Sequence, residues 1–269
     1  MNTMLDLRHE VRRLPLVLSG ATPLDDGARQ AAIAEWTARM VNEHVSSRVF
    51  AGLLPQMMRA GVDASFQAAT ADAVVDELRH ARLCAAVVEA LGGEARAPLP
   101  DLDDMPRHDD VDALEGLLRN VLSVSCLNET VAVALLESNR RHVIESTLRR
   151  VLTEILTDEV GHSRLGWQML SHLAPRIDAG MRARLGAYLV PAFAQLFDRH
   201  TAAQAATPSP ESIETLGVED HRDTTKLLVD VVNDVILPRL EAFDLPAREA
   251  IQSALAPPND EVVVWAATD

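Results

Sequence analysis

Two short motifs, far apart in this 269-residue sequence, combine acidic residues with a histidine. Residues 76–80 read Asp-Glu-Leu-Arg-His, and residues 158–162 read Asp-Glu-Val-Gly-His. Residues three positions apart share one face of a helix, so each motif would present a carboxylate and an imidazole together. With nine histidines in the chain, chance alone would give about 0.05 matches to the pattern Asp-Glu-x-x-His. A pair of such motifs therefore points to metal binding.

Both motifs lie on helix faces that are otherwise apolar, which predicts that Glu77 and Glu159 point into a protein core. Helical steps away from Glu77 reach Phe66, Thr70, Val74, Ala81, Cys84 and Val88. The same steps from Glu159 reach Leu148, Leu152, Ile155, Ser163, Gly166 and Leu170. Glycine and alanine near these positions, such as Gly166 and Gly161, would either leave room for a substrate or permit close helix packing.

Two further helices each place one acid on an apolar stripe. Glu43 falls among Trp36, Met40, Ser47, Phe50 and Leu54, and Glu129 falls among Leu118, Leu122, Cys126, Val133 and Leu136. Glu35 lies two turns before Glu43 and would replace it if the helix register differed. The acids Glu137, Glu145 and Glu154 fall off the stripes and are expected to be solvated.

Four buried carboxylates require compensation, because each buried charge without a partner costs several kcal/mol, of the order of 3 to 5. No Lys or Arg falls on the four stripes. Two divalent cations would balance four carboxylates and two neutral imidazoles, and this mixture of oxygen and nitrogen ligands suits iron or manganese, including a mixed pair. The predicted metal ligands, which are also the predicted catalytic residues, are Glu43, Glu77, His80, Glu129, Glu159 and His162.

The elements that must position these ligands are helices. Aromatic residues make up only 3% of the chain, and Ala, Leu, Arg and Glu recur at helical spacing, so we predict an all-α protein. Long helices are expected over residues 26–60, 63–91, 111–139 and 143–173, with a proline-rich crossover loop over 94–110. They form a four-helix bundle at 26–173. Residues 174–269 are expected to add helices near 179–200, 219–243 and 247–254, followed by a tail. The only strand-like segment in the sequence is 262–265, which lies in this tail. The whole chain is expected to form one domain.

Composition argues against several classes of function. The net charge of −15 would repel a phosphate backbone or an anionic membrane, so nucleic-acid binding is disfavoured. Cys84 and Cys126 are not closely spaced, which argues against a disulfide scaffold or a zinc ribbon and favours a reducing, cytoplasmic location. No run of 18 apolar residues lacks a charge, so no membrane span or export signal is expected.

In ligand order and spacing, residues 35–170 resemble the ferritin-like di-iron carboxylate superfamily. That family takes one Glu from each of two helices and a Glu-x-x-His pair from each of two others. The first and third Glu precede their partner motifs here by 34 and 30 residues, the length of a helical hairpin. The resemblance implies a ferritin-like bundle, two bound metal ions, and Asp76 and Asp158 as partners that orient the ligand imidazoles.

Among the activities of this superfamily, the residues favour an oxygenase. Cys84 occupies the position of the radical Tyr in ribonucleotide reductase small subunits, and Ile155 replaces the third His of arylamine N-oxygenases. A Cys at position 84 resembles the hydroxylase subunits of bacterial multicomponent monooxygenases, although Ala132 and Val133 stand where those enzymes tend to carry a Thr, so proton delivery must differ.

We therefore expect O2 as co-substrate, hydroxylation or N-oxygenation of a small organic molecule, and electrons from an external reductase. A separate reductase is needed because the chain lacks a Gly-x-Gly-x-x-Gly fingerprint and a Walker loop. The alternatives are a tRNA hydroxylase of the ferritin-like class and a non-catalytic iron-binding or storage protein. The sequence leaves a homodimer open.

Overall fold

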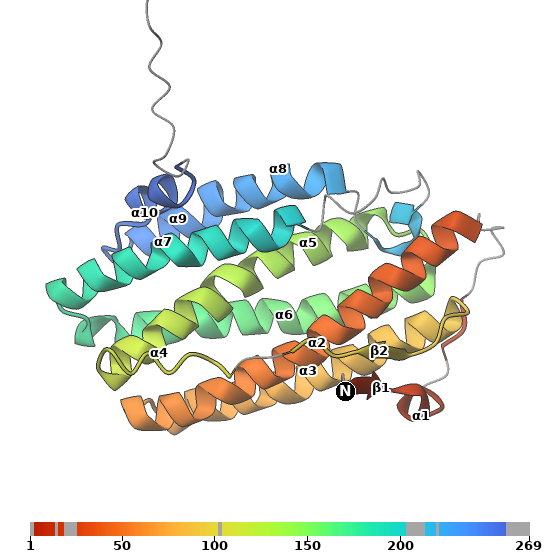
Figure 1. Ribbon diagram of the computed structural model, residues 1–269, viewed down its shortest axis with the longest axis horizontal. Coiled ribbons are helices and arrows are strands. Elements are labelled where there is room, and N and C mark those ends of the chain that lie inside the picture. The colour runs from red at the N-terminus through yellow and green to blue at the C-terminus, as the bar shows by residue number, and fades with distance from the viewer. Residues whose placement is uncertain are drawn as a thin grey trace, which may run out of the picture.

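A computed structural model of the protein describes residues 3–13, 16–18, 26–101, 104–202, 213–218 and 221–256. The predicted strand-like segment 262–265 and the rest of the tail from residue 257 lie outside this part of the chain. Within it, long helices run side by side and make an all-α, ferritin-like bundle, as the sequence predicts (Figure 1).

The first helical hairpin consists of α2 (Asp26–Ala60) and α3 (Ala64–Ala90), in close agreement with the predicted ranges. Gly61 ends α2 with a φ of +65°, a left-handed conformation that glycine adopts without steric cost. The chain then turns within three residues and α3 packs along α2. This hairpin contributes one predicted acid from α2 and one complete Glu-x-x-His motif from α3.

The second hairpin pairs α6 (Ser146–Leu173) with a long composite helix. That helix consists of α4 (Ala113–Val121), a π-helical segment η1 (Leu122–Asn128) and α5 (Glu129–His142). Asp112 caps its start by accepting hydrogen bonds from the amides of Leu114 and Glu115 at 2.9 and 3.0 Å. The sequence predicts one regular helix here; the structure instead widens it over the seven residues that lead to Glu129.

The close approach of α6 to η1 explains Gly166. A Cβ atom at this glycine would lie 2.3 Å from the Cβ of Ser125 and 3.0 Å from its carbonyl carbon. Gly166 therefore permits tight helix packing, which is one of the two roles considered for it. At Gly161, by contrast, a Cβ would meet no described atom within 4 Å.

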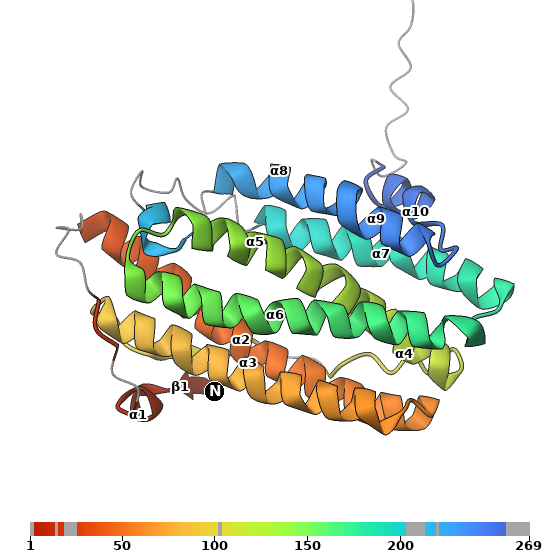
Figure 2. The same cartoon turned by 180° about the vertical axis from the view of Figure 1, so that it is seen from behind.

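The C-terminal helices pack outside the bundle. They comprise α7 (Ala179–Ala202), α8 (His221–Val231), a second π-helical segment η5 (Val232–Ile236), α9 (Leu237–Glu241) and α10 (Ala247–Ala254). Short 3-10 turns occupy Ala174–Arg176 (η2) and Ile213–Leu216 (η4). Both views place α7 and α8 beyond α5, on the side away from α2 and α3 (Figures 1 and 2).

A small two-stranded sheet lies at the N-terminus and corrects the sequence prediction. Strand β1 (Met4–Asp6) pairs antiparallel with β2 (Arg96–Pro98), with Leu5 opposite Ala97, and a short helix α1 (Arg8–Val11) follows. Residues 94–110 are therefore not entirely a loop. Strands of three residues are too short to show an alternating pattern, so hydropathy periodicity does not reveal them.

The apolar core divides into two clusters along the bundle. One cluster contains Met40 of α2 and Ile155 of α6, and the other contains Phe50 of α2 and Leu165 of α6. Glu43 lies between Met40 and Phe50 in sequence, and Glu159 lies between Ile155 and Leu165. The predicted acids thus form a polar layer between two apolar ones, as a buried metal site requires.

The composite helix Ala113–His142 is long and apolar enough to cross a membrane by length and composition alone, and half of the relevant window is buried inside the protein. Core helices of soluble proteins pass the same test. The helix also holds Glu115 and Glu129, which are both buried in the bundle. The expectation that this protein does not span a membrane stays a prediction.

Candidate metal centre

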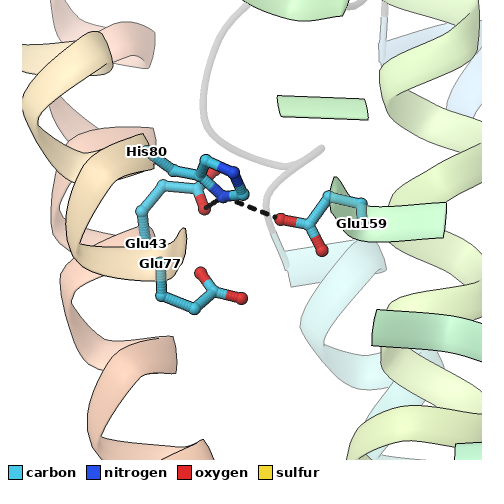
Figure 3. A group of neighbouring side chains, drawn as sticks. All are labelled: Glu43, Glu77, His80 and Glu159. Carbon is cyan, nitrogen blue, oxygen red and sulfur yellow. Dashed lines mark ion pairs between the residues drawn. The ribbon is translucent and has the colours of Figure 1, made fainter. Parts of the chain in front are cut away.

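The structure brings all six predicted ligands together in the polar layer, from four different helices. One group contains Glu43, Glu77, His80 and Glu159, and a second contains Glu77, Glu129, Glu159 and His162. In each group, one potential ligand atom from every residue lies within 4.8 Å of the others. Glu77 and Glu159 belong to both groups, so the arrangement describes two adjacent sites with two shared carboxylates. Figure 3 shows the first group.

Each imidazole directs Nδ1 at carboxylates from two helices. His80 Nδ1 lies 3.2 Å from Glu159 Oε1 and 3.4 Å from Glu43 Oε2 (Figure 3). His162 Nδ1 lies 3.2 Å from Glu159 Oε2 and 3.3 Å from Glu77 Oε1. Two ligands on adjacent corners of an octahedral ion, each about 2.1 Å from it, are about 3.0 Å apart. The observed separations are close to this value.

Burial and unused hydrogen-bonding capacity also fit a cation. The six residues are between 0 and 9% exposed. Glu77 Oε2 and His80 Nδ1 are buried and form no hydrogen bond within the described part of the chain, although Glu159 Oε1 lies 3.2 Å from His80 Nδ1. Unpaired buried polar atoms are costly. Two divalent ions would use these lone pairs and cancel the four carboxylate charges, so the residues fit a pair of metal ions.

Without metal, protons must compensate the same charges. Burial raises the pKa of Glu77 to about 9 and raises the pKa of Glu129 well above its ordinary value. Burial alone would lower the pKa of His80 and His162, but the carboxylates beside them more than reverse this effect, to about 11 and about 10. Burial opposes ionisation of Glu159 too, yet the two imidazoles beside its carboxylate hold its pKa well below the usual range.

The two aspartates contact the imidazoles crosswise. Asp158 Oδ2 accepts from His80 Nε2 at 3.0 Å, and Asp76 Oδ2 lies 3.5 Å from His162 Nε2. Each aspartate therefore faces the histidine of the other helix, not the one three residues beyond its own glutamate. A carboxylate only accepts hydrogen bonds, so this contact places the ring proton on Nε2 and leaves Nδ1 free to bind a metal ion.

A buried hydroxyl chain, which was not predicted from the sequence, lies beside the site. The hydroxyls of Thr130 and Ser163 lie 2.9 Å apart, and the indole N–H of Trp167 donates to Thr130 Oγ1 at 3.1 Å. Thr130 directly follows Glu129, and Ser163 directly follows His162. The chain has Ala132 and Val133 in the next turn, so Thr130 is the residue that places a hydroxyl next to the ligand Glu129. The signal was Ser163, a polar residue on an otherwise apolar stripe.

Other candidates lie outside the two ligand groups. Glu35 is not part of either group, so the helix register selects Glu43. Glu137 pairs with Arg140 and Arg141 on the surface. Cys84 is fully buried, and burial raises the pKa of its thiol well above the ordinary value, so it stays protonated and packs as a small core residue.

Comparison with known proteins supports the fold. No protein-family profile and no curated protein sequence matches the chain. Among solved structures, Protein 19 with aldehyde deformylating oxidase activity from Synechococcus is similar, with a TM-score of 0.61. The alignment covers 86% of this chain and 98% of that chain, with 17% sequence identity. At this identity the likeness shows a shared fold.

Proposed function

We propose that this protein is a di-iron oxygenase, which uses O2 and electrons from a separate reductase to oxidise a small organic molecule. The observation that carries the proposal is the pair of overlapping four-residue groups that share Glu77 and Glu159 in a buried layer. Carboxylates shared in this way would hold two ions close to each other, which is the arrangement that oxygen chemistry at a metal pair requires. Iron is the first choice, and manganese or a mixed pair has the same ligand preferences.

In this proposal, Glu43 and His80 would hold one ion, Glu129 and His162 would hold the other, and Glu77 and Glu159, which belong to both groups, would serve both ions. The bound pair would supply the redox chemistry and the Lewis acidity that O2 reduction requires. Four carboxylates cancel the charge of two divalent ions, which favours retention of the pair. The apolar clusters on both sides of the layer keep bulk water away from the reacting atoms.

The reaction must balance in electrons and protons. Hydroxylation of a substrate R–H consumes O2, two electrons and two protons and yields R–OH and water. A reductase would supply the electrons. The hydroxyls of Thr130 and Ser163 can pass a proton toward the ligands, because each hydroxyl both donates and accepts.

The class of substrate follows only from the comparison and from the chemistry of the site. Because a protein of the same fold has aldehyde deformylating oxidase activity, aldehydes belong in the first panel, together with aromatic amines and hydrocarbons. The buried, apolar surroundings of the layer favour a small uncharged molecule.

Oxygen consumption tests the proposal. The iron-loaded protein is reduced chemically, mixed with O2 and each substrate class, and analysed for O2 uptake and for 18O in the product. We expect one labelled product per O2 with the right substrate, and no product from the matched variant Glu77→Gln. Iron uptake that continues beyond two ions per chain without any substrate effect would instead identify an iron-handling protein. Labelled tRNA would identify a tRNA hydroxylase.

A further inference from the structure

Trp167, on α6, is the aromatic residue that the buried hydroxyl chain connects to the candidate metal centre. Its indole N–H donates to Thr130 Oγ1 at 3.1 Å, and the hydroxyls of Thr130 and Ser163 lie 2.9 Å apart. Thr130 directly follows Glu129, and Ser163 directly follows His162. The indole is therefore connected, through hydroxyls, to the neighbours of the two ligands that belong only to the second ligand group.

A positive charge lies over the face of the Trp167 ring. The guanidinium carbon of Arg239, on α9, is 5.3 Å from the ring centroid. A cation at this distance is attracted by the neutral ring, but it opposes any positive charge that develops on the ring. Loss of one electron from the indole is therefore easier when the N–H proton leaves with the electron. Thr130 Oγ1 is the acceptor for that proton.

Trp36 shows that a cation over the ring does not by itself distinguish Trp167. The guanidinium carbon of Arg39 lies 4.6 Å from the Trp36 ring centroid, and Trp36 Nε1 donates to the Leu216 carbonyl oxygen at 2.9 Å. A carbonyl oxygen accepts a hydrogen bond but has no proton to pass on, whereas a hydroxyl both accepts and donates. Trp36 is also fully buried, while 8% of Trp167 is exposed. Of these two indoles, only Trp167 combines an outlet for its proton with an edge that an external electron donor can approach.

We propose that Trp167 is a redox-active residue that carries single electrons from the reductase to the di-iron centre when no substrate is oxidised. The inference rests on the proposed function, because the oxidant is the oxidised iron pair. The indole gives one electron to that pair and its N–H proton to Thr130 Oγ1, while the hydroxyl proton of Thr130 moves to Ser163 and on toward the oxygen that is being reduced. The neutral indolyl radical then regains one electron from the reductase and one proton from water.

The electron count of a turnover without substrate explains why such a residue is useful. Hydroxylation takes two electrons and two protons from outside, and the substrate itself supplies the other two electrons that O2 accepts. Without substrate, complete reduction of O2 to two molecules of water takes four electrons and four protons. The two missing electrons must then come from the protein or from the reductase. Two passages through Trp167 supply them, with one electron and one proton in each passage.

Freeze-quench electron paramagnetic resonance tests the inference. The iron-loaded full chain is reduced chemically, mixed with O2 without substrate and frozen, and the organic radical is quantified by integration of its signal. Incorporation of ring-deuterated tryptophan narrows the signal if the radical resides on an indole. Trp167→Phe is the test variant, and Trp36→Phe and Trp265→Phe are its matched controls. Trp265 lies outside the described part of the chain.

Further variants test the proton step without removing the indole. Thr130→Val removes the proton acceptor of Trp167, and Thr130→Ser keeps it. Arg239→Gln, at an exposed position, removes the cation that opposes oxidation of the ring. The iron content and the melting temperature of each variant show whether its centre and its fold are intact.

We expect an indolyl radical in the wild type and in both controls, and its loss in Trp167→Phe and in Thr130→Val. Thr130→Ser should retain the radical, and Arg239→Gln should form it faster. If two irons bind and O2 is consumed but no indolyl radical forms, or if the radical persists in Trp167→Phe, the inference is wrong while the proposed function stands. A wild-type protein that binds no iron, or that consumes no O2 when reduced, overturns the proposed function, and the inference with it.

Discussion

Loading the centre with metal should release about four protons per chain. In the metal-free protein near pH 7.5, the raised pKa values keep protons on Glu77, Glu129, His80 and His162. Metal ions bind carboxylates and neutral imidazoles, so two carboxyl protons and two imidazolium protons must leave. The overall binding constant for two ions should then rise about 10,000-fold per pH unit, since each proton contributes about 1.36 kcal/mol per unit.

The assay is anaerobic titration calorimetry with Fe2+ in two buffers that differ in ionisation enthalpy. The difference in heat gives the number of protons released per ion bound. Glu77→Gln is the informative variant, because it removes one of the four titrating groups together with one bridging ligand. Release of no more than one proton per chain would refute the argument that protons occupy the empty centre.

The same protons give the metal-free protein an unusual pH dependence of stability. A group whose pKa is raised in the folded state stabilises the fold below its ordinary pKa, and this contribution is lost as the pH rises through the raised value. For Glu77 that window runs from 4.5 to about 9, and for His80 from 6.5 to about 11. The melting temperature of the metal-free protein should therefore fall between about pH 6 and about pH 9. Bound metal should abolish this fall, and a fall of the same size in the metal-loaded protein would contradict the explanation.

Three pairs of substitutions test other parts of the site and its packing. Glu77→Gln should weaken metal binding at both sites, whereas Glu129→Gln should weaken mainly the site that contains His162. Plasma emission spectrometry gives the metal content of each variant. Equal metal content in the two variants would argue against a Glu77 that is shared by both sites. Gly166→Ala should lower the free energy of unfolding by about 1–3 kcal/mol through overpacking. Gly161→Ala, whose new methyl group would meet open space, should raise the free energy of unfolding by up to about 1 kcal/mol. Urea denaturation measures both changes, and equal changes in the two variants would contradict the packing described for Gly166. Thr130→Val should retain metal but slow turnover about 10- to 100-fold, whereas Thr130→Ser, which keeps the hydroxyl, should remain close to wild type. Unchanged single-turnover kinetics in Thr130→Val would show that the hydroxyls of Thr130 and Ser163 do not deliver protons.

The long helices and the residues that meet between them are predictable from the sequence alone, for a physical reason. Amphipathic helices of 27 and 35 residues carry many turns of apolar periodicity, so the inward face is well determined. An acid such as Glu77 on that face is conspicuous because burial of a lone charge is unfavourable. Four acids on the inward faces of four helices therefore indicate one shared site.

The features that the sequence did not reveal depend on contacts between helices. The π-helical turn before Glu129 adds a residue to one turn, which helical periodicity does not foresee. Arg79 lies off the inward stripe, and its hydrogen bonds to Asp76 on α3 and to Asp158 on α6 depend on how these two helices pack. The crossed pairing of Asp76 and Asp158 has the same origin, because sequence neighbours on a helix say nothing about which partner helix they face.

The central claim is that two metal ions share Glu77 and Glu159 in one centre. Mössbauer spectroscopy of protein reconstituted with 57Fe and oxidised by air tests this claim most directly, because bridged ferric ions couple magnetically. We predict two irons per chain whose spectrum shows a coupled pair with a diamagnetic ground state. A spectrum of isolated, paramagnetic ferric ions, or binding of a single iron per chain, would contradict the claim.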